Sequence, residues 1–463
     1  MFKKITTILL IAAFIVSLVL VGSGCKATTT AAAETTAAAE TTAAAETTEA
    51  SNYNIKAWEG TTINVAIDDR AENQRMKKLI PKFEEATGIK VNIEEMPEAT
   101  LFDKAHLDIE SKTGIYDVIM DDFTRPSKYG PTGLLFALDD FVNDPKMNNP
   151  EWFKVENFSK RLLDGLSVEG KLYGLPLMVN TNVLTIRADL LQEQKLDPPK
   201  TMDDLQNVLA KITKAPDIYG IGYRGLAGQL GNVWPWSGFL DTYGGKWFDK
   251  NWKPTFNSEA GVKATEMFVG LLKDYGAPGQ VTWHWAELQN AFLDGKLAMV
   301  WDAEVFRSRA EDTEISKAAG KLATYFVPYS IDTGKSSPGF YIWGVMMPGG
   351  AKNKEAGWQF IQWWTGTEVG IASEYTSTNE AISKLWAKFK NPEGWPTVSE
   401  VILQSLDAAN PEYRPNIPEL PEVGDRVGIA INEVMTGEKT AKQALDDAAK
   451  DVEKIMEKAG YYK

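Results

Sequence analysis

Strand and helix patterns alternate along the first sixty residues of the folded part, and this alternation constrains the fold most. Residues 62–67 and 89–93 alternate apolar and polar side chains, as half-buried strands do. Apolar residues recur at helical spacing over 76–83 and 101–109, and a third strand pattern covers 116–120. Strand–helix–strand–helix–strand order predicts an α/β fold, with a mainly parallel sheet flanked by helices on both faces.

The same theme continues to the end of the chain. Further helices are expected over 202–212, 260–275, 352–365 and 441–458, and further strands over 297–301 and 323–327. About 400 residues exceed a single ordinary hydrophobic core and therefore indicate two lobes. Ligands of such sheets bind beyond the carboxyl ends of the strands, so the loops after the first and third strands become candidate sites.

The N-terminus has the order of a secretory signal. Two lysines precede a run over residues 5–21 that carries no charge, and small residues then lead to Cys25, the only cysteine. Residues 1–24 are therefore expected to be a signal peptide. A signal that ends at a cysteine resembles the bacterial lipoprotein signal, in which that cysteine is acylated, although Gly22 stands where the pattern usually has Leu. The alternative is an unprocessed membrane anchor with an incidental cysteine.

Residues 25–57 are expected to be a lipid-anchored tether. Residues 31–48 are three copies of Ala-Ala-Ala-Glu-Thr-Thr, which cannot bury enough apolar surface to offset conformational entropy. As a random coil the tether would span on the order of 30 Å. It would hold a domain close to the extracellular face of a bacterial cytoplasmic membrane, attached through the lipid alone.

Composition excludes several classes of function. A formal net charge of −14 without a basic block argues against binding to nucleic acid. Two histidines, His106 and His284, and a single cysteine argue against multi-His metal sites and His-based catalytic triads. We expect no cofactor and no bound metal. Fifteen tryptophans in an acidic secreted chain instead indicate that aromatic side chains take part in ligand binding.

Several separated segments resemble one family in the correct order. They are GLSVEGKLYGLPL at 165–177, YDVIMDD at 116–122, FLDGKLAMVWDAE at 292–304 and PGGAKNKEAGWQFIQWWT at 348–365. Together they resemble the extracellular solute-binding proteins of bacterial ABC importers, in the carbohydrate-type group. Residues 219–225 and 243–259 look closest to the sorbitol/mannitol-type members. The segment 232–240 is richer in tryptophan than in those relatives, so the identity of the sugar stays open.

The resemblance implies a two-lobed fold and a receptor without enzymatic activity. Lobe 1 would hold 58–179 and 300–340, and lobe 2 would hold 182–298 and 344–463. The crossings between lobes would lie near Asn180 and Trp343. A carbohydrate would bridge the lobes of a monomer, and the closed form would dock on the ABC permease subunits in the membrane.

The chemistry of sugar capture suggests which side chains make contact. Aromatic rings cover the C–H faces of a sugar or polyol, while Asp, Asn and Arg bind its hydroxyl groups. The candidate ligand-binding residues are Asp68, Arg70, Asp121, Asp122, Asn180, Arg224, Trp234, Trp236, Trp301, Asp302, Trp343 and Arg414.

Each candidate has a structural alternative. The Trp-Pro-Trp segment reads as a glycine-bounded loop whose tryptophans either stack on sugar or pack under the second lobe. The strand-end aspartates either bind solute or cap a turn or helix. Arg224 either binds solute or forms a salt bridge between loops, Arg414 either binds solute or is solvated, and Trp343 either binds solute or packs in the core.

Two other functions compete with sugar capture. A binding protein for a non-sugar solute such as a polyamine could use the same acidic and aromatic residues. A secreted glycoside-active enzyme could use Asp302 and Glu304 as an acid/base pair, but no carboxylate of the sequence is placed to oppose them across a substrate.

Overall fold

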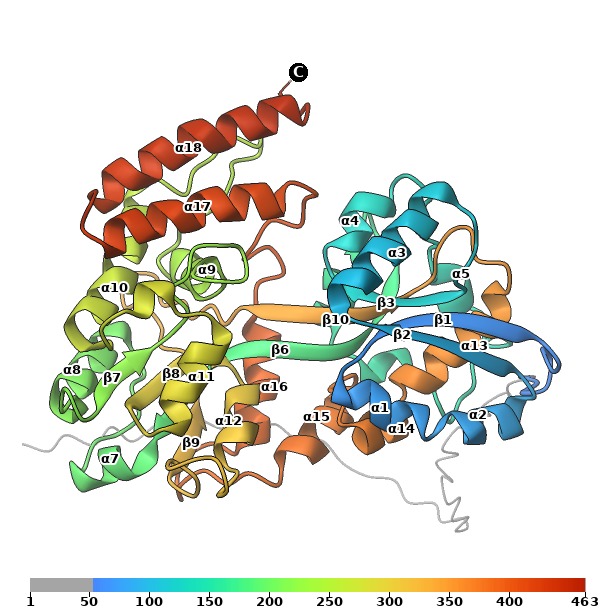
Figure 1. Ribbon diagram of the computed structural model, residues 1–463, viewed down its shortest axis with the longest axis horizontal. Helices are drawn as coiled ribbons and strands as arrows, with labels where there is room; N and C mark the ends of the chain where they lie inside the picture. The colour runs from blue at the N-terminus through green and yellow to red at the C-terminus, as the bar shows by residue number, and fades with distance from the viewer. Residues whose placement is uncertain (1–52, 463) are drawn as a thin grey trace, which may run out of the picture. The chain divides into compact units, whose positions relative to one another are not determined.

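The computed structural model describes residues 53–462, so the expected signal peptide, Cys25 and most of the tether lie outside the described residues. The strands are β1 (Thr62–Asp68), β2 (Lys90–Met96), β3 (Val118–Asp122), β4 (Ser167–Val168), β5 (Lys171–Leu172), β6 (Gly174–Arg187), β7 (Tyr219–Gly222), β8 (Leu297–Ala303), β9 (Leu322–Tyr325) and β10 (Phe340–Met346). Figure 1 shows their arrangement.

Helices outnumber strands in the described part of the chain. The helices up to β8 are α1 (Ala71–Lys77), α2 (Ile80–Thr87), α3 (Glu98–Ser111), α4 (Arg125–Tyr129), α5 (Asp139–Val142), α6 (Lys160–Gly165), α7 (Ala188–Glu193), α8 (Met202–Ile212), α9 (Val233–Thr242), α10 (Glu259–Tyr275) and α11 (Trp285–Leu293). Those after β8 are α12 (Val305–Ala310), α13 (Lys354–Thr365), α14 (Thr367–Ser373), α15 (Asn379–Trp386), α16 (Val398–Ala408), α17 (Leu420–Met435) and α18 (Ala441–Lys458). The expected α/β architecture is confirmed, and no described helix has the length and apolar character that a membrane span requires.

The first three strands form the parallel unit that the sequence predicts. β1 pairs in parallel with both β2 and β3, and the apolar residues Ile63, Val65 and Ile67 of β1 are fully buried. Two short helices, α1 and α2, replace the single helix expected over 76–83. The carboxyl ends of β1 and β3 therefore lie at one edge of the sheet, as the connection rule requires.

One long strand, β6, joins two groups of strands. Its first half, up to Thr181, pairs with β10, which lies next to β3. Its second half, from Asn182 to Arg187, pairs with β8 and β9, and β8 pairs in turn with β7. Figure 1 shows β6 and β10 running from one group toward the other.

The hydrophobic core divides in the same way, and this corrects the expected lobe boundaries. The buried residues of β1–β3, β10 and α13 form one cluster, whereas those of α8–α10, α17 and α18 form another. Residues 300–340, expected in lobe 1, contribute β8 and β9 to the second group. The helices α13–α15, expected in lobe 2, pack on the first cluster. The order of these segments along the chain suggested the wrong lobes, because β6 carries the chain from one group of strands into the other.

Candidate functional site

Buried aspartates stand at the carboxyl ends of three strands, where the sequence placed them. Asp68 ends β1, Asp121 and Asp122 end β3, and Asp302 lies near the end of β8; all four are buried. A buried carboxylate needs a cation or several donors to offset the loss of water. An arginine forms an ion pair with an aspartate at each of the three strand ends.

The pair on β8 comes from two elements far apart in sequence. Arg224, after β7, donates from Nε and Nη2 to the two carboxylate oxygens of Asp302 at 2.8 and 2.7 Å. Its Nη1 donates to the carbonyl of Leu230 at 2.8 Å. This bidentate geometry fixes both side chains. Nearby, burial and then the charge of Arg224 lower the pKa of His284.

The pair on β3 includes a residue that the sequence analysis missed. Arg125 donates from Nε to Asp121 at 3.0 Å, and Asp121 also lies 2.9 Å from His106 Nε2. Burial alone would lower the pKa of Arg125, but the charges of Asp121 and Asp122 outweigh burial and raise it. Arg125 follows the strand by only three residues, and that spacing is the signal that could have revealed it.

Asp122 is tied to a buried tyrosine on the crossing strand β10. Tyr341 donates from its hydroxyl to Asp122 Oδ2 at 3.1 Å. Burial, and then the charge of Asp122, raise the pKa of Tyr341 well above its ordinary value. Tyr341 therefore stays neutral and keeps its proton as a donor. Nothing in the sequence distinguished it from the aromatic neighbours that pack in the core.

The pair on β1 leads to a second aromatic contact. Arg70 donates from Nε to Asp68 at 2.7 Å, and its guanidinium carbon lies 4.1 Å from the ring centroid of Trp343. Trp343 in turn stacks on Phe102 at 5.8 Å and lies 5.7 Å from Tyr341. These contacts connect the strand end of β1 with that of β3.

Trp234 is the centre of the remaining candidates. It lies on α9 rather than in the expected loop, with the guanidinium carbons of Arg414 and Arg224 4.9 and 5.8 Å from its ring centroid. Its ring also meets Tyr341 and Tyr413 edge-on at 6.2 and 6.0 Å. We call Trp234, Arg224, Arg414, Tyr341 and Tyr413 the tryptophan cluster. It joins residues of both groups of strands.

Two predicted residues lie elsewhere, which corrects their assignment. Trp236 is fully buried in the second core, where its indole nitrogen donates to Thr265 Oγ1 at 2.9 Å. Trp301 is also fully buried in that core and stacks on Phe239 at 4.4 Å. Neither ring faces the tryptophan cluster, because successive residues of a strand, such as Trp301 and Asp302, point to opposite faces, and residues two apart on a helix point in different directions.

Asn180 marks the point where β6 passes between the groups. Its side-chain amide donates to Glu304 Oε1 at 3.1 Å, and the backbone of Thr181 donates to Glu304 Oε2 at 2.8 Å. Burial raises the pKa of Glu304 to about 7. A cavity of about 100 Å³ lies here, lined from both groups by residues that include Met178, Asn180, Glu304 and Trp386.

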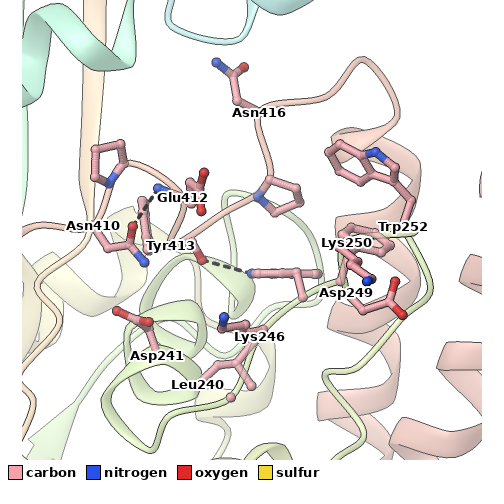
Figure 2. Close-up of a pocket in the computed structure, with 15 residues that line it drawn as sticks. Leu240, Asp241, Lys246, Asp249, Lys250, Trp252, Asn410, Glu412, Tyr413 and Asn416 are labelled. Atoms are coloured by element: carbon pink, nitrogen blue, oxygen red, sulfur yellow. Dashed lines mark hydrogen bonds between the residues drawn. The ribbon is translucent and has the colours of Figure 1, made fainter. Parts of the chain in front are cut away.

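A larger cavity lies behind the segment that carries Arg414. Its volume is about 560 Å³. Figure 2 shows Lys246, Trp252, Asn410 and Tyr413 among its lining residues. Trp247 donates from its indole nitrogen to the carbonyl of Tyr413 at 2.9 Å on this side. None of the predicted site residues lines it. It therefore does not coincide with the tryptophan cluster, although Tyr413 belongs to both.

The arrangement offers hydrogen-bonding pairs and aromatic faces but no metal site. Within residues 53–462, no group of three or more His, Cys, Asp or Glu side chains could hold a metal ion. Asp302 and Glu304 also fit poorly as an acid/base pair, because Asp302 is held by Arg224 and Glu304 by the backbone of Thr181.

Comparison with known proteins agrees with this geometry. Residues 68–371 match the model of the bacterial extracellular solute-binding protein family. A mannitol-binding protein of Pseudomonas aeruginosa is 28% identical, over 87% of this chain and 94% of that protein. An ABC transporter solute-binding protein of Agrobacterium vitis with bound D-mannitol is 28% identical, with a TM-score of 0.70 over 87% of this chain and all (100%) of that chain.

A second solved structure gives the same result. An ABC transporter solute-binding protein of Agrobacterium radiobacter in complex with ribitol is 26% identical, with a TM-score of 0.71 over 86% of this chain and 99% of that chain. The family match covers most of the described residues; it begins at Asp68, the last residue of β1, and includes β3, β6, β8 and β10. This chain therefore belongs to the bacterial extracellular solute-binding protein family.

Proposed function

We propose that this protein captures a neutral polyol or sugar between its two groups of strands and delivers it to an ABC permease. The tryptophan cluster carries the proposal, because Arg224, Tyr341 and Arg414 converge on the ring of Trp234 from different segments of the chain. Relatives whose names or bound ligands are mannitol and ribitol support a polyol as the solute.

The balance of charge favours an uncharged solute. Asp68, Asp121, Asp122 and Asp302 supply four negative charges, and Arg70, Arg125, Arg224 and Arg414 supply four positive charges. Each of these four aspartates already forms an ion pair with an arginine, so none is left over for a cationic ligand, whereas hydroxyl groups can donate to carboxylates and accept from guanidinium groups. Flat rings such as Trp234 and Trp343 suit the C–H faces of a polyol.

The shared strands give the proposed mechanism of capture. Residues near Asn180 on β6 and near Trp343 on β10 are the proposed hinge between the lobes. A solute that contacts Asp122 on one side and Arg224 and Trp234 on the other would favour the closed arrangement, since it gains contacts with both sides only there. The closed form would then be recognised by the permease.

Attachment to the membrane is also part of the proposal. Cys25 would carry the lipid, and residues 25–57 would allow the receptor to reach the permease as a monomer. Membrane fractionation of wild type and Cys25→Ala tests this point. Equal membrane retention of both proteins would contradict an acyl anchor and leave solute capture untouched.

Calorimetry with purified protein tests solute capture. We expect saturable binding of at least one member of a panel of D-mannitol, D-sorbitol, ribitol, erythritol and maltose, with no chemical change in the ligand. Asp302→Ala should abolish this binding, because it removes a hydroxyl acceptor and leaves Arg224 without its carboxylate partner. Arg187→Lys, at a partly exposed ion pair with Asp189 at the far end of β6, is the control. If no member of the panel binds to the wild type, the proposal is wrong.

A further inference from the structure

Three side chains at the tryptophan cluster carry buried polar atoms that have no hydrogen-bond partner among the residues the structure describes. They are Arg414, through Nε and Nη2; Trp234, through Nε1; and Asn182, through Nδ2 and Oδ1. At most 2% of the surface of each residue is exposed. Nearly all buried polar groups in folded proteins are hydrogen-bonded, so a group of unpaired ones in one place requires an explanation.

The three side chains occupy one region. The guanidinium carbon of Arg414 lies 4.9 Å from the ring centroid of Trp234 and 5.2 Å from that of Tyr413. Asn182 reaches the same place over Gly339, where an added Cβ would come within 3.1 Å of Asn182 Nδ2 and 2.5 Å of the Tyr413 ring. Tyr413 thus connects all three.

Arg414 differs from the other arginines of the site. Arg70, Arg125 and Arg224 each form an ion pair with an aspartate, whereas no ion pair of Arg414 occurs within residues 53–462. Its Nη1 donates to the carbonyl of Gln229 at 3.3 Å, and aromatic rings, including those of Phe123 and Tyr341, surround the rest. Its charge is therefore offset by ring faces rather than by a carboxylate.

The unpaired atoms are mostly donors. Arg414, Trp234 and Asn182 together present N–H groups from Nε, Nη2, Nε1 and Nδ2, and a single acceptor, Asn182 Oδ1. Hydroxyl oxygens accept from such donors, and one hydroxyl hydrogen can return a bond to Oδ1. An ammonium group has no lone pair to offer, and it would bring a second cation beside a buried guanidinium.

We propose that Arg414, Trp234 and Asn182 form a donor site that receives the hydroxyl oxygens of an uncharged polyol and rejects the corresponding ammonium compounds. We refer to these three residues as the donor site. The proposal rests on the proposed function and deepens it, because it assigns the preference for an uncharged solute to three named residues. Solute oxygens would satisfy the unpaired donors when the lobes are closed, so Arg414 also couples occupancy to closure.

A matched pair of ligands tests the rejection of cations. D-mannitol and 1,6-diamino-1,6-dideoxy-D-mannitol differ only at their two ends, so either orientation of the diamine presents an ammonium group. Calorimetry at pH 7 should show the diamine binding at least ~100-fold more weakly than mannitol to the wild type. If ribitol binds more tightly than mannitol, ribitol and its 1,5-diamine replace the pair. A diamine that binds within about threefold of the polyol would overturn the proposal.

Variants of Arg414 separate its charge from its donor geometry. Arg414→Gln should weaken polyol binding by ~10-fold or more and reduce the discrimination against the diamine, since the charge is gone. Arg414→Lys should weaken polyol binding but keep the discrimination. If Arg414→Gln discriminates as well as the wild type, the proposal is wrong. A mannonate that binds more tightly than mannitol would also contradict a site for uncharged solutes.

Two conservative changes test the other donors. Trp234→Phe keeps an aromatic ring without the indole N–H, and Asn182→Asp replaces a donor by an acceptor of the same shape; each should weaken polyol binding by ~5- to 20-fold. Thermal denaturation identifies any variant that fails to fold, and Arg187→Lys again serves as the control with unchanged affinity. Unaltered affinity in both folded variants would exclude the donor site, while failure of every polyol to bind to the wild type would refute the proposed function itself.

Discussion

Trp234 and Trp236 lie two residues apart on α9, and both are buried, yet their surroundings are opposite. Trp236 sits in the second core, with its ring against Trp247 at 5.5 Å and its indole nitrogen bonded to Thr265. Trp234 belongs to the first core although its helix belongs to the second, and two guanidinium groups flank its ring. Its indole nitrogen has no partner among the described residues.

The difference shows that burial alone does not separate a structural tryptophan from a binding one. Residues two apart on a helix are rotated by about 200°, so one ring enters its own core and the other points away from it. The satisfied indole of Trp236 stabilises the fold. The unpaired indole N–H of Trp234, beside Arg414, is suited to donate a hydrogen bond to a ligand oxygen.

The largest expected effect on stability is that of Trp236. Trp236→Ala should lower the free energy of unfolding by ~3–5 kcal/mol, because it leaves a large cavity in a close-packed core. Urea denaturation measures this loss, and solute affinity of the protein that remains folded should be unchanged. A loss below about 1 kcal/mol would mean that the second core does not depend on this ring, and it would contradict the structural role assigned to Trp236.

Trp234→Ala should show the reverse behaviour. Loss of the ring and of its N–H removes contacts at the centre of the tryptophan cluster, so polyol affinity should fall by ~2–4 kcal/mol, or roughly 30- to 1000-fold. The loss of stability should be smaller than for Trp236→Ala, because Trp234 has no bonded indole to lose. Calorimetry and urea denaturation of both variants, run side by side, decide the point. Equal affinity losses in the two variants would contradict the division of roles.

The sequence identified Trp234 and Trp236 as candidates but did not show that their rings enter different cores. Glycines bound the segment at Gly231 and Gly238, and Pro235 lies between the rings, so the pattern favours a loop. The structure begins α9 at Val233, which puts Pro235 in the first turn, where its missing N–H costs nothing. The helix fixes which ring faces which core, and no pattern of the sequence could reveal that.

Local sequence patterns were sufficient to predict the strands whose ends carry the aspartates. Alternation and strand ends predicted Asp68, Asp121, Asp122 and Asp302 at the carboxyl ends of the strands, and all four are there. Arg70 and Arg125 follow their aspartate partners closely in sequence, but Arg224 reaches Asp302 from a distant segment, and pairing over such a distance leaves no periodic trace. The lobe boundaries failed for the same reason, since the course of the chain after β10 depends on which core each helix finds.

Glu304 extends the comparison from tryptophans to carboxylates. Asp302 is paired with Arg224, whereas Glu304, two residues later, is buried with hydrogen bonds from Asn180 and Thr181 but without an ion pair in the described chain. Lys388, Glu72 and Glu374 line the same cavity, and Asp302 raises the pKa of Glu304 further after burial has raised it.

The pH dependence of stability tests this difference. Because burial raises the pKa of Glu304 from 4.5 to about 7, its contribution to stability is fully present below pH 4.5 and is lost as the pH rises through 7. Glu304→Gln stays neutral, so the stability of wild type relative to this variant should fall by ~2–3 kcal/mol between pH 5 and pH 8. Urea denaturation across this range measures the difference. A constant difference would show that Glu304 ionises normally in the folded protein.

The smallest effect is expected from a substitution that leaves the indole N–H of Trp236 unpaired, as that of Trp234 is among the described residues. Thr265→Val removes the acceptor of the Trp236 indole, and also the hydroxyl that donates to the carbonyl of Gly261 at 2.8 Å, while keeping the shape of the side chain. An unsatisfied buried N–H costs ~1–2 kcal/mol, so stability should fall by that amount, with no change in polyol affinity. Thermal denaturation with calorimetry on the same sample gives both values. If Thr265→Val leaves stability unchanged, an unpaired indole N–H costs little free energy in this protein. The unpaired indole N–H of Trp234 would then no longer indicate a ligand contact.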